Sequence, residues 1–142
     1  MLVKNLMTSN VITITPDSSI KEVGRILKEK RISGIPVVDN DGELVGIITL
    51  TDLFKILGQI YHWRKVESVA PELRISEMFE KEKEEAKVAS YMTKAVFTVE
   101  EEEPIEAVMD LMFERNVHTI PVTRKGKLVG VIGQRDLIYS CF

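Results

Sequence analysis

The sequence has little of several features that would indicate particular classes of protein. Cys141 is the single cysteine among 142 residues, so the chain can build neither a disulfide framework nor a zinc site of cysteines. Its apolar runs are only a few residues long and residues 1–7 do not resemble a secretory signal, so we expect a cytoplasmic protein with no membrane partner. The net charge is −3 and the basic residues are dispersed, which argues against nucleic acid as a partner.

The sequence does contain an ordinary globular fraction of hydrophobic residues, 44%, and an internal duplication. When the chain is slid against itself by about 85 residues, two pairs of segments align. The pairs are NLMTSNVITITPDSSI with SYMTKAVFTVEEEEPI, and SGIPVVDNDGELVGIITLTDL with HTIPVTRKGKLVGVIGQRDL. The period is too long for a solenoid, so we interpret it as a duplicated small domain. The repeats cover residues 1–58 and 88–142, and residues 59–87 form a helical linker or insert.

Each repeat has the pattern β-α-β-β-α. In the first repeat, Ser19 and Glu22 have the spacing of a capping box at a helix start, and Gly42 suits a tight hairpin turn. The expected strands are residues 11–14, 35–38 and 44–48 in the first repeat, and 96–99, 120–123 and 128–132 in the second. One repeat is too small to bury a sufficient core. We therefore predict an α/β protein of the α+β type, with two repeats packed sheet to sheet in pseudo-twofold symmetry.

The insert between the repeats is expected to be mostly helical. Residues 59–66 continue the preceding helix, Pro71 interrupts it, and residues 72–88 form a second helix. Residues 80–87 mix charges of both signs at helical spacing, which is typical of a solvated face. The acidic run Glu100–Glu103 precedes a helix, so we interpret it as charge at a helix start and solvation, and expect no metal site.

The order and spacing of these segments resemble a pair of CBS domains, a Bateman module, over nearly the whole chain apart from about residues 58–85. The motifs are Met7-Thr8 and Met92-Thr93, Ile35-Pro36-Val37 and Ile120-Pro121-Val122, and the ends GIITLTDL and GVIGQRDL. The resemblance implies two clefts for adenosine ligands such as AMP, ADP, ATP or S-adenosylmethionine. It also implies regulation of an attached or separate effector protein, and helix-to-helix dimers.

The segment from Gly46 to Asp52 resembles the nucleotide motif of this family. A strand ends there and a helix begins, whose free N–H groups and positive dipole favour phosphate. Gly46 allows close backbone approach, while Thr49 and Thr51 add hydroxyl donors. The carboxylate of Asp52 can accept both ribose hydroxyls, as an acidic residue does in dinucleotide folds. The same residue types are preferred helix N-caps, so capping is the alternative interpretation of all three polar residues.

The resemblance adds residues from other segments to the predicted ligand site. Those expected to contact adenine, mostly through backbone and apolar surface, are Thr13, Ile14, Thr15, Pro16, Gly34, Ile35 and Pro36. The partner repeat adds His118, Thr119, Ile120 and Pro121. His118 resembles basic positions that reach ligand phosphates in the AMP-activated protein kinase gamma subunit, and an ordinary half-buried histidine is the alternative.

The second repeat departs from the nucleotide motif. It retains Asp136 but has Gly133 where the first repeat has Thr49, so one hydroxyl is missing. Arg135 either meets phosphate through two hydrogen bonds or is a surface cation. We therefore expect the Asp52 site to be the stronger, with the difference largest for AMP or adenosine and smaller for ATP.

We expect a non-catalytic regulatory module that binds an adenosine ligand and transmits its binding state to a partner. The alternative is a dimerisation or assembly module without physiological nucleotide binding. A homodimer is expected from the apolar content of the helices, at Ile26, Leu57, Met109, Met112 and Phe113. An enzyme has little support, because the sequence offers no nucleophile–base pair, metal cluster or phosphate-cradling glycine loop.

Overall fold

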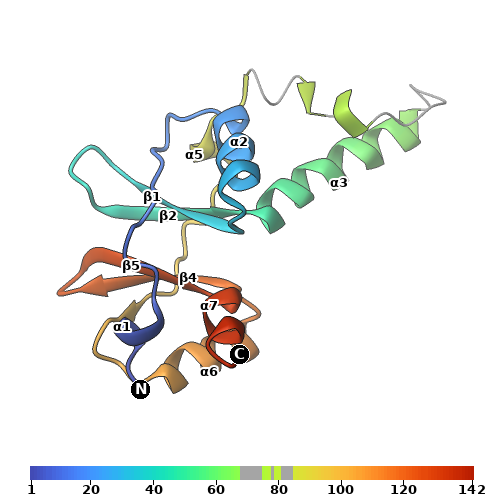
Figure 1. The fold of residues 1–142 in the computed structure, drawn as a ribbon. Coiled ribbons are helices and arrows are strands. Elements are labelled where there is room, and N and C mark those ends of the chain that lie inside the picture. The colour runs from blue at the N-terminus through green and yellow to red at the C-terminus, as the bar shows by residue number, and fades with distance from the viewer. Residues whose placement is uncertain (68–74, 78, 81–84) are drawn as a thin grey trace.

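The structure is a computed structural model that describes residues 1–67, 75–77, 79–80 and 85–142. It forms two similar α+β halves whose sheets face each other, so the predicted fold class is confirmed (Figure 1). The first half contains α2 (Ile20–Lys30), β1 (Gly34–Val38), β2 (Leu44–Thr49) and α3 (Leu50–Glu67). The second contains β3 (Val99–Glu100), α6 (Ile105–Arg115), β4 (Thr119–Arg124), β5 (Lys127–Gly133) and α7 (Gln134–Tyr139). The short elements are α1 (Val3–Leu6), η1 (Ile75–Glu77) and α5 (Val88–Tyr91).

The hairpins β1–β2 and β4–β5 are antiparallel, and β3 pairs parallel with β4. Their turns contain Gly42 at φ 79° and Gly126 at φ 81°, a backbone region in which other residues are strained. The first strand of each repeat is shorter than predicted. Ile14 alone bridges Val37, because the chain turns directly afterwards with a hydrogen bond from the Ser18 N–H to the Thr15 carbonyl.

Helix α2 shows how local sequence sets the fold. The Ser19 hydroxyl accepts a 3.1 Å hydrogen bond from the Glu22 N–H, so the hydroxyl half of the predicted capping box is present. Ile20, Val23 and Leu27 are buried on one side of the helix, as their spacing predicts. This buried face holds α2 against the sheet of the first half.

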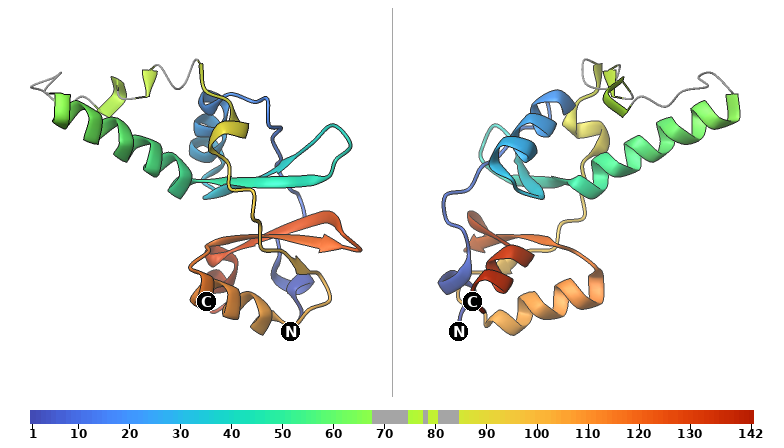
Figure 2. Two further views of the ribbon diagram at one scale, coloured as in Figure 1. Left: turned by 180° about the vertical axis from the view of Figure 1, so that it is seen from behind. Right: turned by 45° about the vertical axis from the view of Figure 1, so that its right-hand side comes forward.

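Each half is completed by the short helix that precedes the other repeat. Val3 of α1 is fully buried in the core of the second half, and Val88 of α5 is fully buried in the core of the first. The N–H of Val3 donates to the Glu103 carbonyl at 2.9 Å, and the N–H of Val88 donates to the Ser18 carbonyl at 2.9 Å. The chain therefore crosses between the halves twice, as the two views of Figure 2 show.

The predicted insert is described only in part. Helix α3 runs to Glu67, so residues 59–66 do continue the helix of the first repeat. Pro71 and much of the helix predicted over residues 72–88 lie outside the described residues. Within that predicted helix, the described segment η1 is a short 3-10 helix. Within the described ranges, no helix is both long and apolar enough to cross a membrane.

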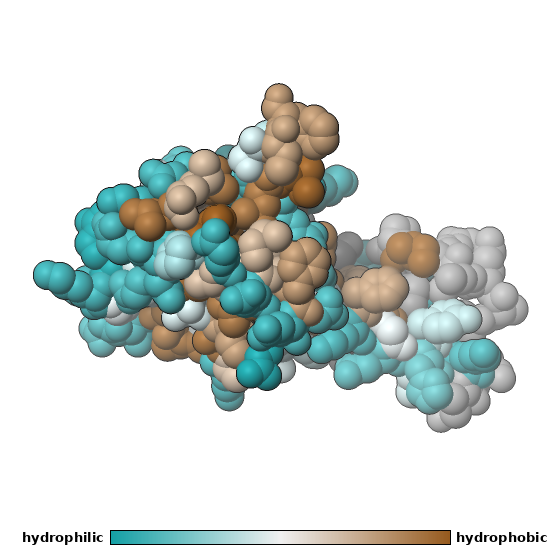
Figure 3. Space-filling model, turned by 90° about the horizontal axis from the view of Figure 1, so that it is seen from below, coloured by the Kyte–Doolittle hydropathy of each residue, from teal (hydrophilic) through white to brown (hydrophobic). Residues whose placement is uncertain are grey.

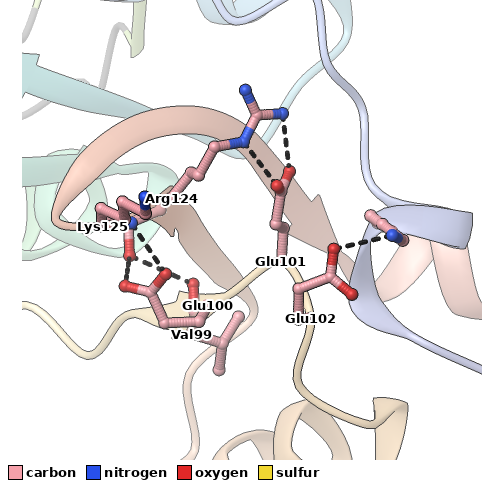
Figure 4. A network of polar contacts seen from close by, with 8 residues as sticks. Val99, Glu100, Glu101, Glu102, Arg124 and Lys125 are labelled. Atoms are coloured by element: carbon pink, nitrogen blue, oxygen red, sulfur yellow. Dashed lines mark hydrogen bonds and ion pairs between the residues drawn. The ribbon is translucent and has the colours of Figure 1, made fainter.

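The acidic run Glu100–Glu103 is more structured than the sequence suggested. Glu101 is only 7% exposed, and its carboxylate accepts hydrogen bonds from the Arg124 guanidinium at 2.5 and 3.1 Å (Figure 4). These hydrogen bonds lower the pKa of the Glu101 carboxyl. Lys4 pairs with Glu102 at 2.7 Å and so ties the N-terminal segment to this loop. The acidic run therefore makes specific ion pairs with other segments of the second half. It does not serve only as solvated negative charge at the start of a helix.

Candidate functional site

Asp52 lies in the first turn of α3, directly after β2, and is only 8% exposed. Its Oδ2 accepts hydrogen bonds from the backbone N–H of Thr49 at 2.9 Å and from the Thr49 hydroxyl at 3.1 Å. The N–H of Asp52 donates in turn to Thr49 Oγ1 at 3.3 Å. The two residues therefore cap the helix reciprocally, and the cap fixes the orientation of the carboxylate.

The other oxygen of this carboxylate is held from the second repeat. Thr93, which follows α5, donates its hydroxyl to Asp52 Oδ1 at 3.0 Å. Its backbone exchanges hydrogen bonds of 2.9 and 2.8 Å with Ile47 of β2. A Cβ at Gly46 would lie only 3.0 Å from the Thr93 carbonyl oxygen. The close approach expected at Gly46 is therefore made by the protein's own backbone.

Asp52 and Thr93 border a cleft of about 410 Å³ between the repeats. We call this the Asp52 cleft. Its lining from the first repeat includes Thr49, Thr51 and Lys55, and its lining from the second includes Val96, Phe97 and His118. The cleft therefore combines apolar surface, a carboxylate, hydroxyls and a cation.

The second repeat repeats this arrangement around Asp136. The N–H of Gly133 donates to Asp136 Oδ2 at 2.8 Å, and the Thr8 hydroxyl donates to Oδ1 at 3.1 Å. A Cβ at Gly130 would lie 3.2 Å from the Thr8 carbonyl oxygen, so the close approach is repeated as well. One difference between the two sites is the hydroxyl that Gly133 cannot supply.

Asp136 borders a separate cleft of about 480 Å³, which we call the Asp136 cleft. Lys30 and Arg31 line it from the end of α2, and Arg135 lines it from α7. The guanidinium of Arg135 donates to the backbone carbonyl of Arg31. Basic side chains of both repeats therefore meet beside one carboxylate.

The structure distributes the predicted site residues over both clefts. Thr49, Thr51, Asp52 and His118 line the Asp52 cleft, and Thr119 lines both. Gly34 and Pro36 line the Asp136 cleft with Arg135 and Asp136, although Gly34 also pairs with Thr49 of β2. His118 is exposed, and its Nδ1 lies 2.7 Å from the Gln134 amide nitrogen.

The remaining predicted residues line neither of these two clefts in the described part of the chain. They are Thr13, Ile14, Thr15, Pro16, Ile35, Ile120 and Pro121. Ile35 and Ile120 are fully buried core residues, and the Pro121 side chain is also buried. Ile14 is 4% exposed and pairs with β1, while Thr15 lies 3.1 Å from the Ser18 hydroxyl.

Sequence reasoning missed several residues that shape the clefts. Thr8 and Thr93 were noticed only as a repeated motif, although a hydroxyl retained in both copies is itself a signal of a polar role. Phe97, Lys55 and Arg31 carried no such signal. They belong to the clefts because of how the two repeats are packed.

Comparison with known proteins decides the family. Residues 3–59 and 88–141 each match the CBS domain. The chain belongs to the CBS domain family. The resemblance seen in its motifs is thereby confirmed.

Relatives of this CBS protein occur alone and within enzymes. It is 33% identical over 139 residues to a CBS domain-containing protein of Dictyostelium discoideum, with 97% of this chain and 89% of that protein covered. It is 30% identical over 134 residues to inosine-5′-monophosphate dehydrogenase of Methanocaldococcus jannaschii, but the match covers 94% of this chain and only 22% of the enzyme. The same domain pair therefore also occurs as a minor part of a much longer chain.

A similar solved structure is the CBS domain pair of protein MJ0100 in complex with 5′-methylthioadenosine and S-adenosyl-L-methionine. The two are 28% identical with a TM-score of 0.77, over 99% of this chain and 95% of that one. The overall arrangement of two packed α+β repeats is therefore shared with a CBS pair that binds adenosine compounds.

Proposed function

We propose that this CBS pair is a non-catalytic regulatory module that binds an adenosine-containing ligand between its repeats. The observation that carries the proposal is the duplicated site, in which Asp52 and Asp136 each border a cleft and each accept a hydrogen bond from a threonine of the other repeat. The similar CBS pair in complex with 5′-methylthioadenosine and S-adenosyl-L-methionine supports this class of ligand. AMP, ADP and ATP are the other candidates.

The carboxylates are suited to hold ribose. An ionised carboxylate has about four acceptor positions. The described contacts of Asp52 use three of them, for Thr49 and Thr93, whereas those of Asp136 use two, for Gly133 and Thr8. Each aspartate thus retains acceptor capacity for a ribose hydroxyl. In the Asp52 cleft, the N–H groups of Leu50 and Asp52 already donate to the Ser33 carbonyl and the Thr49 hydroxyl. Phosphate would therefore meet the positive dipole and the remaining first-turn N–H groups of the 18-residue α3.

The position of the clefts supports a regulatory role. Each is lined by both repeats, and each aspartate is hydrogen-bonded across the boundary between them. A ligand that fits one arrangement of the repeats better than another shifts the population towards that arrangement. A separate effector protein that contacts both halves would then respond to the ligand.

Mass spectrometry of small molecules released from the purified chain tests the proposal first. Calorimetry then follows with AMP, ADP, ATP, 5′-methylthioadenosine and S-adenosylmethionine, and with GTP as the control for base recognition. We expect at least one adenosine compound to bind better than GTP. If none of the five adenosine compounds binds at millimolar concentration, the proposal is wrong, and the alternative of a dimerisation or assembly module is favoured.

We also propose a homodimer, because two exposed surfaces are complementary. An apolar groove of about 810 Å³ between α2 and α3 is lined by Phe54 and Leu57, and also by Lys28. On α6, Phe113 is 80% exposed and Asp110 is an exposed acidic neighbour. Figure 3 shows hydrophobic surface interspersed with hydrophilic side chains on the face seen from below, where α6 lies. The occupant we propose for the groove is α6 of a second copy, in an antiparallel twofold dimer in which each copy's α6 lies in the other's groove.

The apolar residues that suggested this dimer divide into two groups. Ile26 and Met112 are 9% and 7% exposed and belong to the chain's own cores, because they face the sheets. Met109 and Phe113 remain exposed at 36% and 80%. Leu57 lines the groove. The proposal therefore rests on these three residues and the surrounding charges.

We further propose that residues 1–58 and 88–142 act as the two CBS repeats, with residues 59–87 as an insert. The ranges that match the CBS domain, 3–59 and 88–141, support these boundaries. The exchange of α1 and α5 between the halves means that neither repeat would complete its core alone.

A further inference from the structure

The duplication allows the linings of the two clefts to be compared position by position. Arg135 in the Asp136 cleft stands where the first repeat has Thr51, one residue before the aspartate in both copies. Arg31 stands where the second repeat has Asn116. Both of these residues follow a helix and both have φ 54°, so the backbone is the same while the side chains differ.

In a third pair of equivalent residues, both side chains are cationic, but only one of them lines a cleft. Lys30 lines the Asp136 cleft. Its counterpart Arg115 has its guanidinium carbon 5.5 Å from the centre of the Phe97 ring, a cation–π contact. Arg115 does not appear in the lining of the Asp52 cleft within the described part of the chain.

The two clefts therefore differ in charge balance: the Asp136 cleft has an excess of cations, and the Asp52 cleft does not. Among described lining residues, the Asp136 cleft has three lysine or arginine side chains, Lys30, Arg31 and Arg135, against one aspartate. The Asp52 cleft has one, Lys55, against its aspartate, together with the His118 imidazole. Polyphosphate carries several negative charges close together, and arginine can meet phosphate oxygens through two parallel hydrogen bonds.

On the basis of the proposed function, we infer that the two clefts prefer adenosine ligands of different charge. The Asp136 cleft binds the polyphosphate nucleotide, ATP or ADP, and the Asp52 cleft binds an adenosine compound with one phosphate or none. The missing hydroxyl at Gly133 weakens the Asp136 cleft for AMP or adenosine, as the sequence suggested. For ATP, the three cations outweigh that loss and reverse the order of the two clefts.

The chain supplies matched substitutions for the test. Arg135→Thr and Arg31→Asn replace each cation by the residue that the other repeat has at the same position. Asn116 already has the left-handed conformation, so Arg31→Asn leaves the backbone unstrained. Thr51→Arg is the reverse change, and it adds a cation beside the Asp52 cleft.

Calorimetric titrations of the full chain use ATP, AMP and 5′-methylthioadenosine in a buffer with EDTA. In the wild type we expect the tighter ATP site to be lost in Asp136→Ala and retained in Asp52→Ala. Arg135→Thr and Arg31→Asn should each weaken ATP binding about tenfold and change AMP binding at the Asp52 cleft less than twofold. Thr51→Arg should strengthen ATP binding at the Asp52 cleft about tenfold.

The outcomes separate this inference from the proposed function. The wild type could bind AMP or 5′-methylthioadenosine while Arg135→Thr and Arg31→Asn leave the ATP affinity unchanged. That result would overturn the preference of the two clefts for ligands of different charge, but it would leave the proposed adenosine-binding function in place. Absence of all nucleotide binding in the folded wild type would overturn both. Circular dichroism melting of every variant shows whether a loss of affinity comes from unfolding.

Discussion

The hydroxyl of Thr93 donates a 3.0 Å hydrogen bond to the Asp52 carboxylate, so a residue of the second repeat holds the proposed ribose-binding group of the first. Thr8 and Asp136 make the equivalent contact at 3.1 Å. The duplicated contact means that each proposed binding group is oriented by both repeats. Ligand affinity should therefore depend on residues that touch the carboxylate from the opposite repeat.

Thr93→Val tests this dependence, since valine keeps the shape of threonine and removes only the hydroxyl. A hydrogen bond to a charged group contributes about 1.5–3 kcal/mol, and part of that should appear as lost binding. We expect about tenfold weaker AMP binding at the Asp52 cleft by calorimetry. Thr8→Val is the control and should weaken the Asp136 cleft instead. Equal effects of both variants on one site would contradict the cross-repeat assignment.

Asp52→Ala should cost about 1–3 kcal/mol of adenosine-ligand binding, because a ribose hydroxyl loses its acceptor. The same change removes the cap shared with Thr49, so the loss alone would be ambiguous. Asp52→Asn retains an oxygen that can accept from the Thr49 N–H but loses the charge. We expect Asp52→Asn to melt near the wild-type temperature and still bind AMP more weakly. Wild-type AMP affinity in both folded variants would remove Asp52 from the site.

The sequence was sufficient where structure is determined locally. The cap at Ser19, the positive φ of Gly42 and the two antiparallel hairpins follow from residue types at short spacing. The first strands were overestimated because β-branched residues predict extended chain but not the pairing partner. Only Ile14 of residues 11–14 reaches β1, and β3 begins at Val99.

The packing of distant segments could not be predicted from the sequence. The helices α1 and α5 are four residues long, too short to show a periodic pattern that would reveal where they pack. The same limit affected the site. Gly34 and Pro36 were expected near Asp52, but the pseudo-twofold arrangement places them in the other cleft.

Val3→Ala and Val88→Ala test the exchange of α1 and α5. Both side chains are fully buried in the half formed by the other repeat. Removing two buried methyl groups should lower the free energy of unfolding by about 2 kcal/mol, and Tm by roughly 6 °C. Urea unfolding followed by circular dichroism should show one shared transition in each variant. A neutral Val3→Ala would show that α1 does not contribute to the second core.

Glu101 and Arg124 should make stability depend on pH. Arg124 lowers the pKa of Glu101 in the folded chain, so the pair stabilises the fold above the carboxyl's ordinary pKa of 4.5. That stabilisation is lost as pH falls through the lowered pKa and Glu101 becomes protonated. Arg124→Gln should therefore melt below the wild type at pH 7, with the difference shrinking as the pH falls below 4.5 and disappearing once Glu101 is protonated in the folded chain. Glu101→Gln is the control, and adding Arg124→Gln to it should cause little further change.

Finally, the proposed twofold dimer makes a prediction about charge reversal. Contact between Lys28 of one copy and Asp110 of the other occurs twice in a twofold dimer. Lys28→Glu and Asp110→Lys should each place like charges together and raise the dimer dissociation constant at least tenfold, as a rough estimate. The double variant Lys28→Glu/Asp110→Lys restores opposite charges and should dimerise like the wild type. Light scattering across a dilution series in low salt measures all three variants.

Phe113 supplies the apolar side of the same test. Its burial in the α2–α3 groove of a second copy would make Phe113→Ser cost about 2 kcal/mol in each of the two equivalent contacts. Trp63→Ser is the matched control, because Trp63 is 54% exposed on α3 but does not line the groove. We expect Phe113→Ser to be monomeric at tens of micromolar and Trp63→Ser to remain dimeric. A wild type that is monomeric at this concentration would overturn the dimer. A dimer insensitive to Phe113→Ser and to both single charge reversals would show that it forms through another face.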